Sequence, residues 1–169
     1  MTAFVALLRA VNVGGTGELP MAELKAMAQA CGFERVRTYI ASGNLVFESA
    51  ARESDVKAAL EKALADYAGK PVGVMVRTAA EMAAVLAVNP FPDKPPSRVG
   101  VIFLNAPPPA DALTELVAPG GEEVRLGRRE IYVHFPEGMG VSKLKLPAGK
   151  AGTTRNINTV AKLAEMARA

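Results

Sequence analysis

The feature that most constrains this chain is the order in which its apolar segments switch between strand and helix periodicity. Phe4–Leu8 is a short apolar run, typical of a strand that is buried on both faces. After Pro20, a favoured residue at a helix start, apolar residues recur at helical spacing until Gly32, which is suited to end a helix. The apolar stripe of this helix comprises Met21, Leu24, Met27, Ala28 and Cys31.

The following segment predicts a hairpin, a second helix and a fourth strand. The turn Ala41–Asn44 is a hairpin signal, because Gly and Asn tolerate a positive φ. The expected elements are strands at Val36–Ile40 and Leu45–Phe47, a helix from about Ser54 to Gly69, and a strand at Val72–Arg77. The order β-α-β-β-α-β is that of a ferredoxin-like unit, an antiparallel four-stranded sheet with two helices on one face.

The pattern restarts after a proline-rich connector at residues 89–97. The expected elements of this half, with the helix before the connector, are helices at Ala79–Val88, Ala110–Val117 and Ile157–Arg168 and strands at Val99–Leu104, Val124–Leu126 and Ile131–Phe135. No closing strand is evident here. We therefore expect an α+β fold of two ferredoxin-like units with antiparallel sheets, packed together, the second unit being incomplete. The units are expected at residues 1–78 and 79–169.

Composition excludes several classes of protein. A single cysteine, Cys31, rules out an internal disulfide and fits the apolar stripe of its helix. Neither a signal peptide nor a run of about 18 apolar residues is present, so we expect a cytoplasmic protein with no membrane partner. The net charge of +3 comes from 20 cationic and 17 acidic residues, which alone does not imply nucleic acid. Aromatic residues make up only 5%, which counts against a surface that stacks bases.

Two glycine-bearing loops are expected to meet at one edge of the first sheet. In this topology the first and second strands run in the same direction, so the loops that follow them lie near each other. The residues brought together are Asn12, Gly14 and Gly15 on one loop, and Ser42, Gly43 and Asn44 on the other. Backbone N–H groups of such loops can hold an anion. The alternative is two tight turns that need glycine for their own geometry.

A basic segment near the C-terminus is the second candidate site. No acidic residue occurs between Glu137 and Glu165, while five cations do: Lys143, Lys145, Lys150, Arg155 and Lys162. Thr153 or Thr154 is expected to cap the last helix, which would place Arg155 in its first turn. A cation at the positive end of the helix dipole costs about 0.3–1 kcal/mol, and a bound phosphate or carboxylate would offset this. The alternative is a solvated basic loop.

Several motifs also resemble a known family. Ala6-Leu-Leu-Arg-Ala-Val-Asn-Val-Gly-Gly15 is similar to that family's Ala-Leu-Leu-Arg-Gly-Ile-Asn-Val-Gly-Gly. Further similar segments are Met21 with Leu24, Gly32-Phe33, Val36–Asn44, Asn89–Pro92, Ser142–Leu144 and Thr153–Val160. The family is the bacterial domain of unknown function numbered 1697, and the resemblance spans nearly the whole chain. Ala10 stands where the family usually has Gly, and Ile157 where it usually has Trp.

The resemblance implies two ferredoxin-like units and no particular activity. From the residues we take as candidate ligand-binding groups Arg9, Asn12, Gly14, Gly15, Ser42, Gly43, Asn44, Lys143, Lys150, Thr154, Arg155, Asn156 and Asn158. The first hypothesis is binding of a phosphate-bearing or other anionic ligand, either a nucleotide or nucleic acid. The second is a small enzyme that acts on an anionic small molecule. The third is an interaction or assembly protein whose motifs are purely structural.

Other groups point to no further chemistry. The only histidine, His134, is expected on a strand with no Ser or Cys nucleophile as a visible partner, and a structural role is expected for it. No spacing of His, Cys, Asp and Glu predicts a metal site, and no cofactor is expected. The sequence leaves open whether the chain is an enzyme and which oligomeric state it adopts.

Overall fold

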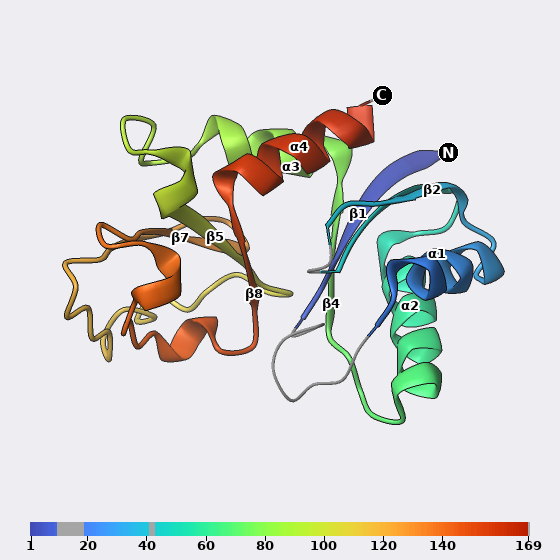
Figure 1. Ribbon diagram of the computed structural model, residues 1–169, viewed down its shortest axis with the longest axis horizontal. Coiled ribbons are helices and arrows are strands. Elements are labelled where there is room, and N and C mark those ends of the chain that lie inside the picture. Colours follow the sequence, from blue (N-terminus) through green and yellow to red (C-terminus); the bar gives the residue numbers. More distant parts are fainter. Residues whose placement is uncertain (10–18, 41–42, 169) are drawn as a thin grey trace. The chain divides into compact units, whose positions relative to one another are not determined.

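The computed structural model describes residues 1–9, 19–40 and 43–168 and has a mixed α+β architecture (Figure 1). Two four-stranded antiparallel sheets are present, which confirms the predicted fold class. The chain forms two compact units, Met1–Ala83 with Leu163–Ala169, and Ala84–Lys162. The boundary expected after residue 78 stays a prediction.

The first unit follows the predicted element order. It comprises β1 (Thr2–Leu8), α1 (Met21–Ala30), β2 (Glu34–Thr38), β3 (Asn44–Ser49), α2 (Glu53–Ala68) and β4 (Val74–Thr78). The strand order in the sheet is β2-β3-β1-β4, and each neighbouring pair is antiparallel. This arrangement is compatible with a ferredoxin-like unit.

The core of the first unit lies between its sheet and its two helices. Figure 1 shows α1 and α2 on the same face of the sheet. Phe4, Ala6 and Leu8 of β1 belong to this core because alternate residues of a strand point to the same face. Phe47 lies opposite Phe4 in the register of β3, and its ring stacks on Phe33 with centroids 4.4 Å apart. The helices contribute Leu24, Ala28, Val56, Leu60 and Leu64.

The second unit contains a closing strand that the sequence analysis did not predict. Its strands are β5 (Val99–Phe103), β6 (Glu123–Leu126), β7 (Glu130–His134) and β8 (Thr153–Asn156), in the order β6-β7-β5-β8. The strand β8 pairs with β5, so the sheet is complete and repeats the strand order of the first unit. Thr153 and Arg155 are buried and Thr154 is exposed. This alternation is that of a strand, but its polar residues give no hydrophobic signal.

The helix predicted over Ala110–Val117 is wrong. In its place, successive hydrogen bonds of the i to i+3 type form a run of turns, from Ala112 N to Pro109 O, Thr114 N to Asp111 O and Leu116 N to Leu113 O. The other connection of this sheet contains only the short 3-10 helices η2 (Met139–Val141) and η3 (Pro147–Gly149). Proline and glycine are frequent in both connections, and both residue types disfavour a helix interior.

Two helices each run from one unit into the other. Thr78 caps α3 (Ala79–Ala87), since its Oγ1 accepts a hydrogen bond from Glu81 N while Glu81 Oε1 accepts one from Thr78 N. The sequence predicts a buried stripe of Ile157, Val160, Leu163, Ala164 and Ala167 on α4 (Ile157–Arg168); all of these are buried except Ile157, which is partly exposed. The Arg37 guanidinium donates to the carbonyl of Met166 at 2.9 Å, in the last turn of α4.

Within the described ranges, no helix has the length and apolar character needed to cross a membrane.

Gly152 is expected to be essential for the pairing of β8. A Cβ atom on this residue would lie 2.6 Å from Phe103 O and 2.7 Å from Ile102 Cγ2. Gly152→Ala should therefore lower the free energy of unfolding by about 1–3 kcal/mol through overpacking. Urea unfolding measures this change. Gly140→Ala is the matched control, because a Cβ there would meet no atom within 4 Å. Equal effects of the two substitutions would contradict the prediction.

Candidate functional site

The described residues of the first predicted group, Arg9, Gly43 and Asn44, lie where β1 ends and β3 begins in the first sheet. The N–H of Leu8 donates to Gly43 O at 2.9 Å, and the N–H of Arg9 donates to Gly73 O at 2.9 Å. The end of β1 is thus joined to the segments that precede β3 and β4. Gly43 has a φ of +86°, as its place in the predicted turn requires. Arg9 is exposed, while Asn12, Gly14, Gly15 and Ser42 lie outside the described residues.

Asn44 has a clear structural role in the hairpin. Its side chain is fully buried, and its Nδ2 donates to Tyr39 O at 2.8 Å. The carbonyl of Asn44 accepts the N–H of Tyr39 at 3.2 Å, so both its backbone and side chain close the turn. Ile40, the residue after Tyr39, has a φ of +50° although it is β-branched, and its side chain is half exposed. Such strained backbone occurs at tight turns and at functional sites.

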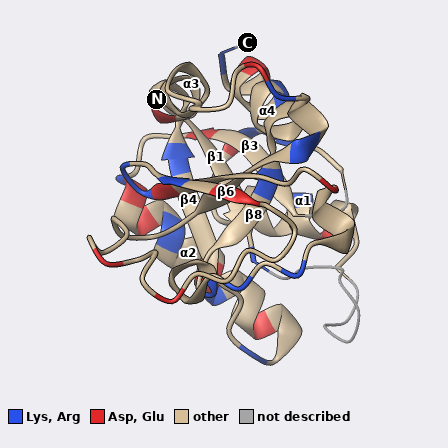
Figure 2. Ribbon diagram, turned by 90° about the vertical axis from the view of Figure 1, so that its left-hand side faces the viewer, with Lys and Arg blue, Asp and Glu red and all other residues tan. Residues whose placement is uncertain are grey.

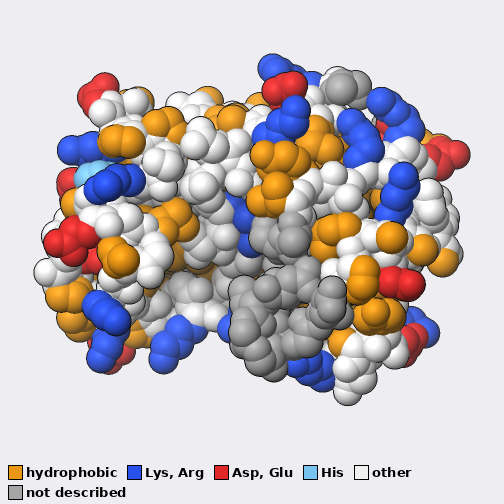
Figure 3. Space-filling view, in the orientation of Figure 1, with side chains coloured by type: hydrophobic (Ala, Val, Ile, Leu, Met, Phe, Trp, Pro, Cys, Tyr) orange, Lys and Arg blue, Asp and Glu red, His pale blue; other side chains and the backbone are white. Residues whose placement is uncertain are grey.

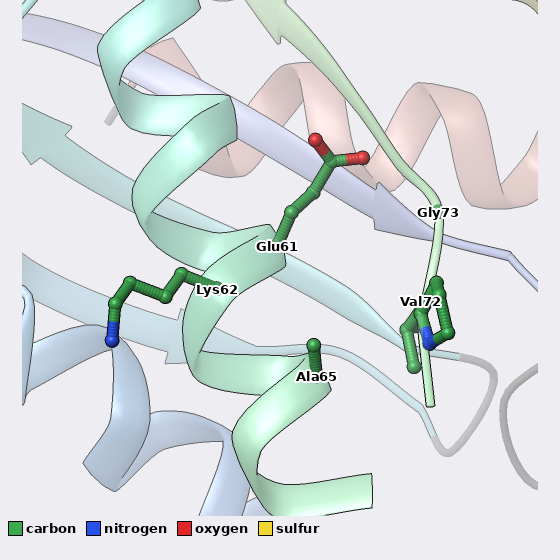
Figure 4. A pocket seen from close by; sticks show the side chains of 6 residues that line it. Glu61, Lys62, Ala65, Val72 and Gly73 are labelled. Atoms are coloured by element: carbon green, nitrogen blue, oxygen red, sulfur yellow. The ribbon is translucent and has the colours of Figure 1, made fainter. Parts of the chain in front are cut away.

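A pocket of about 400 Å³ lies between α2 and the segment that leads into β4 (Figure 4). It is lined by Glu61, Lys62, Ala65, Pro71, Val72 and Gly73. The stem of Arg9 lies next to Gly73, because a Cβ there would be 3.5 Å from Arg9 Cβ. Figure 4 shows the Lys62 side chain extending away from Val72 and Gly73. The sequence analysis missed this pocket, and its lining carries no motif that would have revealed it.

The second group lies on β8 and at the start of α4, and here one expectation is corrected. Arg155 is not in the first turn of the last helix, because Thr153–Asn156 forms a strand and the helix begins at Ile157. Neither Thr153 nor Thr154 caps this helix. The cap is Asn156, whose Oδ1 accepts a hydrogen bond from Thr159 N at 2.9 Å. The argument that Arg155 opposes the helix dipole from within the first turn is therefore wrong.

Arg155 is instead a buried cation of the sheet. It is 6% exposed, opposite Val101 of β5. Its Nη1 donates to Thr153 Oγ1 at 2.7 Å and to Thr154 O at 3.0 Å. Burial lowers the pKa of Arg155 to about 10, so the guanidinium still carries its charge at neutral pH. A buried charge depends on such hydrogen bonds, because desolvation of an ion is unfavourable.

The remaining predicted residues of this group come before and after the start of α4 along the chain. Thr154 and Asn158 are exposed, and the first turn of α4 contains no acidic residue. Lys150 is exposed directly after η3, and Lys143 is exposed between Ser142 and Leu144. The structure thus places the predicted residues in two sets, with Arg9, Gly43 and Asn44 in the first unit and the other six described residues in the second.

Glu122 anchors the segment that carries Lys143. Its Oε2 accepts the Ser142 hydroxyl at 2.6 Å, and its Oε1 accepts the N–H of Gly120 at 2.9 Å. Ser142 Oγ in turn accepts the N–H of Leu144 at 3.1 Å. The hydrogen bond from Ser142, followed by backbone hydrogen bonds, holds the pKa of Glu122 below its ordinary value. In the sequence, Glu122 and Glu123 are interpreted as a solvated turn; this is wrong for Glu122, which is buried and bound to Ser142, a partner 20 residues away.

Cys31 packs against the core of the first unit, and the described residues form no group suited to bind a metal ion. Cys31 is partly buried against the core of the first unit, its Sγ lies 3.8 Å from Ala59 O, and burial raises the pKa of its thiol. In the part of the chain that the structure describes, no three of His, Cys, Asp and Glu gather in a way that could hold a metal ion.

Comparison with known proteins gives a family and a structural relative. The family model described as "Protein of unknown function (DUF1697)" matches residues 1–132. A similar solved structure is that of the conserved bacterial protein SP0830 from Streptococcus pneumoniae. It has a TM-score of 0.81 and 25% sequence identity, and the similarity covers 98% of each chain. No curated protein matches the sequence.

The two motif asparagines at the start of α4 are predicted to differ in their effect on stability. Asn156→Ala should lower the free energy of unfolding by about 1 kcal/mol, because it removes the cap of the helix. Asn158→Ala should change it by less than about 0.5 kcal/mol, since this side chain is exposed. Thermal and urea unfolding of both variants check the prediction. A loss at Asn158 as large as that at Asn156 would contradict it.

The carboxylate of Glu122 should make stability sensitive to acid. Because its pKa is lowered in the folded state, its contribution is present above the pKa of the unfolded chain and is lost as the pH falls through the folded value. Glu122→Gln should therefore lower stability at neutral pH and flatten the acid side of the stability curve. Urea unfolding across the acid range measures this. Glu115→Gln, an exposed residue of the same unit, serves as the control, and an unchanged acid limb in Glu122→Gln would refute the assignment.

Proposed function

We propose that this chain, which belongs to the family described as protein of unknown function (DUF1697), binds a phosphate-bearing or other anionic ligand around the start of α4. The observation that carries the proposal is the charge of the segment between Glu137 and Glu165, which contains five cations and no acid. A segment with five cations and no acid of its own carries a local excess of positive charge, and such an excess attracts anions.

The local geometry supports the same location. The positive end of the α4 dipole has no acidic residue in its first turn, and Asn156 already caps one of its N–H groups. Thr154 and Asn158, two residues before and two residues after Asn156, are both exposed. Lys143 and Lys150 add exposed ammonium groups from the preceding connection. Helix starts of this kind are suited to phosphate groups.

The charge distribution favours a small ligand such as a nucleotide over a long nucleic acid. Figure 3 shows Lys and Arg side chains interspersed with Asp and Glu side chains on the face in view, and the ribbon of Figure 2 shows cationic and acidic positions along the same elements. A protein that tracks a nucleic-acid backbone typically presents a broad basic stripe. The ligand class that fits best is therefore a nucleotide or a similar small phosphate compound.

A second candidate function, an interaction or assembly protein with structural motifs, is favoured by one observation. Three polar side chains of the motifs bond within their own surroundings, namely Asn44 to Tyr39 O, Asn156 to Thr159 N and Arg155 to Thr153 and Thr154. Side chains that serve the backbone in this way are expected in motifs that only maintain a fold. The small-enzyme hypothesis gains no comparable support from the described residues.

Ligand titrations distinguish these candidates. Pyrophosphate, ATP and a single-stranded oligonucleotide should be titrated at about 20 mM and about 200 mM salt. We expect ATP or pyrophosphate to bind more weakly at the higher salt. Lys143→Ala and Lys150→Ala should each weaken binding and reduce the slope of log K against log salt by about one.

Lys25→Ala and Lys94→Ala are matched controls, because both remove an exposed lysine outside the basic segment. Tighter binding of the oligonucleotide than of ATP would overturn the preference for a small ligand. No binding of any probe, or equal losses in the controls, would reject the anion site and leave the structural interpretation.

A further inference from the structure

His134 has an enclosed ring nitrogen that the fold alone does not explain. It lies at the end of β7, opposite Glu123 of β6 on one side and Val99 of β5 on the other. Only 7% of the residue is exposed, and within the described residues its Nδ1 has no hydrogen-bond partner. Buried polar atoms in folded proteins nearly always have a partner, so this nitrogen calls for a physical explanation.

The Glu123 carboxylate supplies that explanation. Its Oε1 lies 3.5 Å from His134 Nδ1, which is an ion-pair distance and longer than the usual hydrogen bond of about 2.7–3.2 Å. If the neutral ring carried its hydrogen on Nε2, the lone pair of Nδ1 would face a carboxylate oxygen, and the two would repel each other. A hydrogen on Nδ1 removes this repulsion and turns the contact into an attraction between an N–H group and a carboxylate.

The other groups around His134 leave Glu123 as its charged neighbour at close range. From β6, Arg125 Nη2 lies 3.8 Å from Glu123 Oε2, and the guanidinium of Arg125 is 5.8 Å from the centre of the Phe91 ring. Phe91 faces His134 with ring centres 5.9 Å apart. From β5 the opposite residue is the uncharged Val99, and the guanidinium of Arg98, the residue before it, donates to the carbonyl of Pro136. In the segment around Phe91, Asp93 and Lys94 are both exposed.

On β7 itself, Glu130 and Tyr132 share the face of His134, because alternate residues of a strand point the same way. Tyr132 donates its hydroxyl hydrogen to Val85 O at 2.8 Å. Burial, with a further contribution from Glu130, raises the pKa of Tyr132 above its ordinary value, so the phenol stays neutral throughout the range in which an imidazole titrates.

We propose that the Glu123 carboxylate keeps the hydrogen of neutral His134 on Nδ1, so that the ring becomes charged when Nε2 takes up a proton. The charged ring stabilises the pairing of β6 with β7 more than the neutral ring does. The strand β6 has four residues and lies at the edge of its sheet, where β7 is its only neighbouring strand. A single cross-strand ion pair therefore acts on an element with few other attachments, which makes this edge a pH-sensitive part of the fold.

The direction of the pH effect follows from the charges. Imidazole side chains in general change charge between about pH 5 and 8, a range in which carboxylates are ordinarily ionised. The attraction between ring and carboxylate is thus greatest on the acid side of this range and weakens as the pH rises. The pairing of β6 with β7 is then weakest in mildly alkaline solution.

The first test is the position of the hydrogen in the unmodified protein. His134 is the only histidine, so nitrogen-15 spectra contain a single imidazole. At about pH 8.5 the neutral ring should be in the Nδ1–H form. Glu123→Ala should shift it toward the Nε2–H form. An Nε2–H ring in the unmodified protein, or no response to Glu123→Ala, would overturn the proposal without requiring any variant of His134 to fold.

The second test is a double-mutant cycle with Glu123→Gln and His134→Gln. Urea unfolding of the four proteins should give a coupling of about two- to five-fold in the unfolding equilibrium constant at about pH 5.5, and a smaller one at about pH 8.5. Because the cycle cancels every titration outside the pair, a coupling that does not change with pH would refute the stabilising role of the charged ring. The binding tests above do not involve this pair, so either proposal can fail alone.

Discussion

The backbone pairing of the two central strands is the constraint on which both units depend. β1 is hydrogen-bonded to β3 and β4, and β5 to β7 and β8, so each central strand has a partner on both sides. All five residues of β5 are buried, as are residues 4–8 of β1. A strand in this position satisfies its polar backbone groups and removes its side chains from water at the same time. The partners of the central strands then determine where the loops and the polar motif residues lie.

These central strands also position both candidate sites. Arg9 follows directly from β1, and its backbone is held by Gly73 before β4. On the other sheet, pairing with β5 aligns β8 so that Arg155 lies opposite Val101 and the chain enters α4 immediately afterwards. The start of α4 is therefore held in place by β8, an edge strand of the second sheet. A helix start fixed in this way is better suited to hold an anion than one on a free loop, because less ordering is required on binding.

Several residues that look like ligand groups in the sequence serve the backbone in the structure. Asn44 closes a hairpin and Asn156 caps a helix, and both roles exploit the short amide side chain. The signal for a ligand residue and the signal for a cap are the same at the level of sequence, because both require a polar side chain beside a turn. Exposure separates them here, since Thr154 and Asn158 are exposed and Asn44 is fully buried.

The amino-acid sequence by itself determined the α+β class, the element order of the first unit and the apolar face of α1. These follow from local periodicity, which depends only on residues a few positions apart. Only the tertiary structure decided that Thr153–Asn156 is a strand, that residues 110–117 form turns, and that Glu122 anchors Ser142. It also decided that Glu123 faces His134. Each of these depends on a partner distant in sequence. The polar strand β8 forms because β5 offers a backbone edge to pair with; its two threonines favour a strand, but no hydrophobic alternation marks it in the sequence.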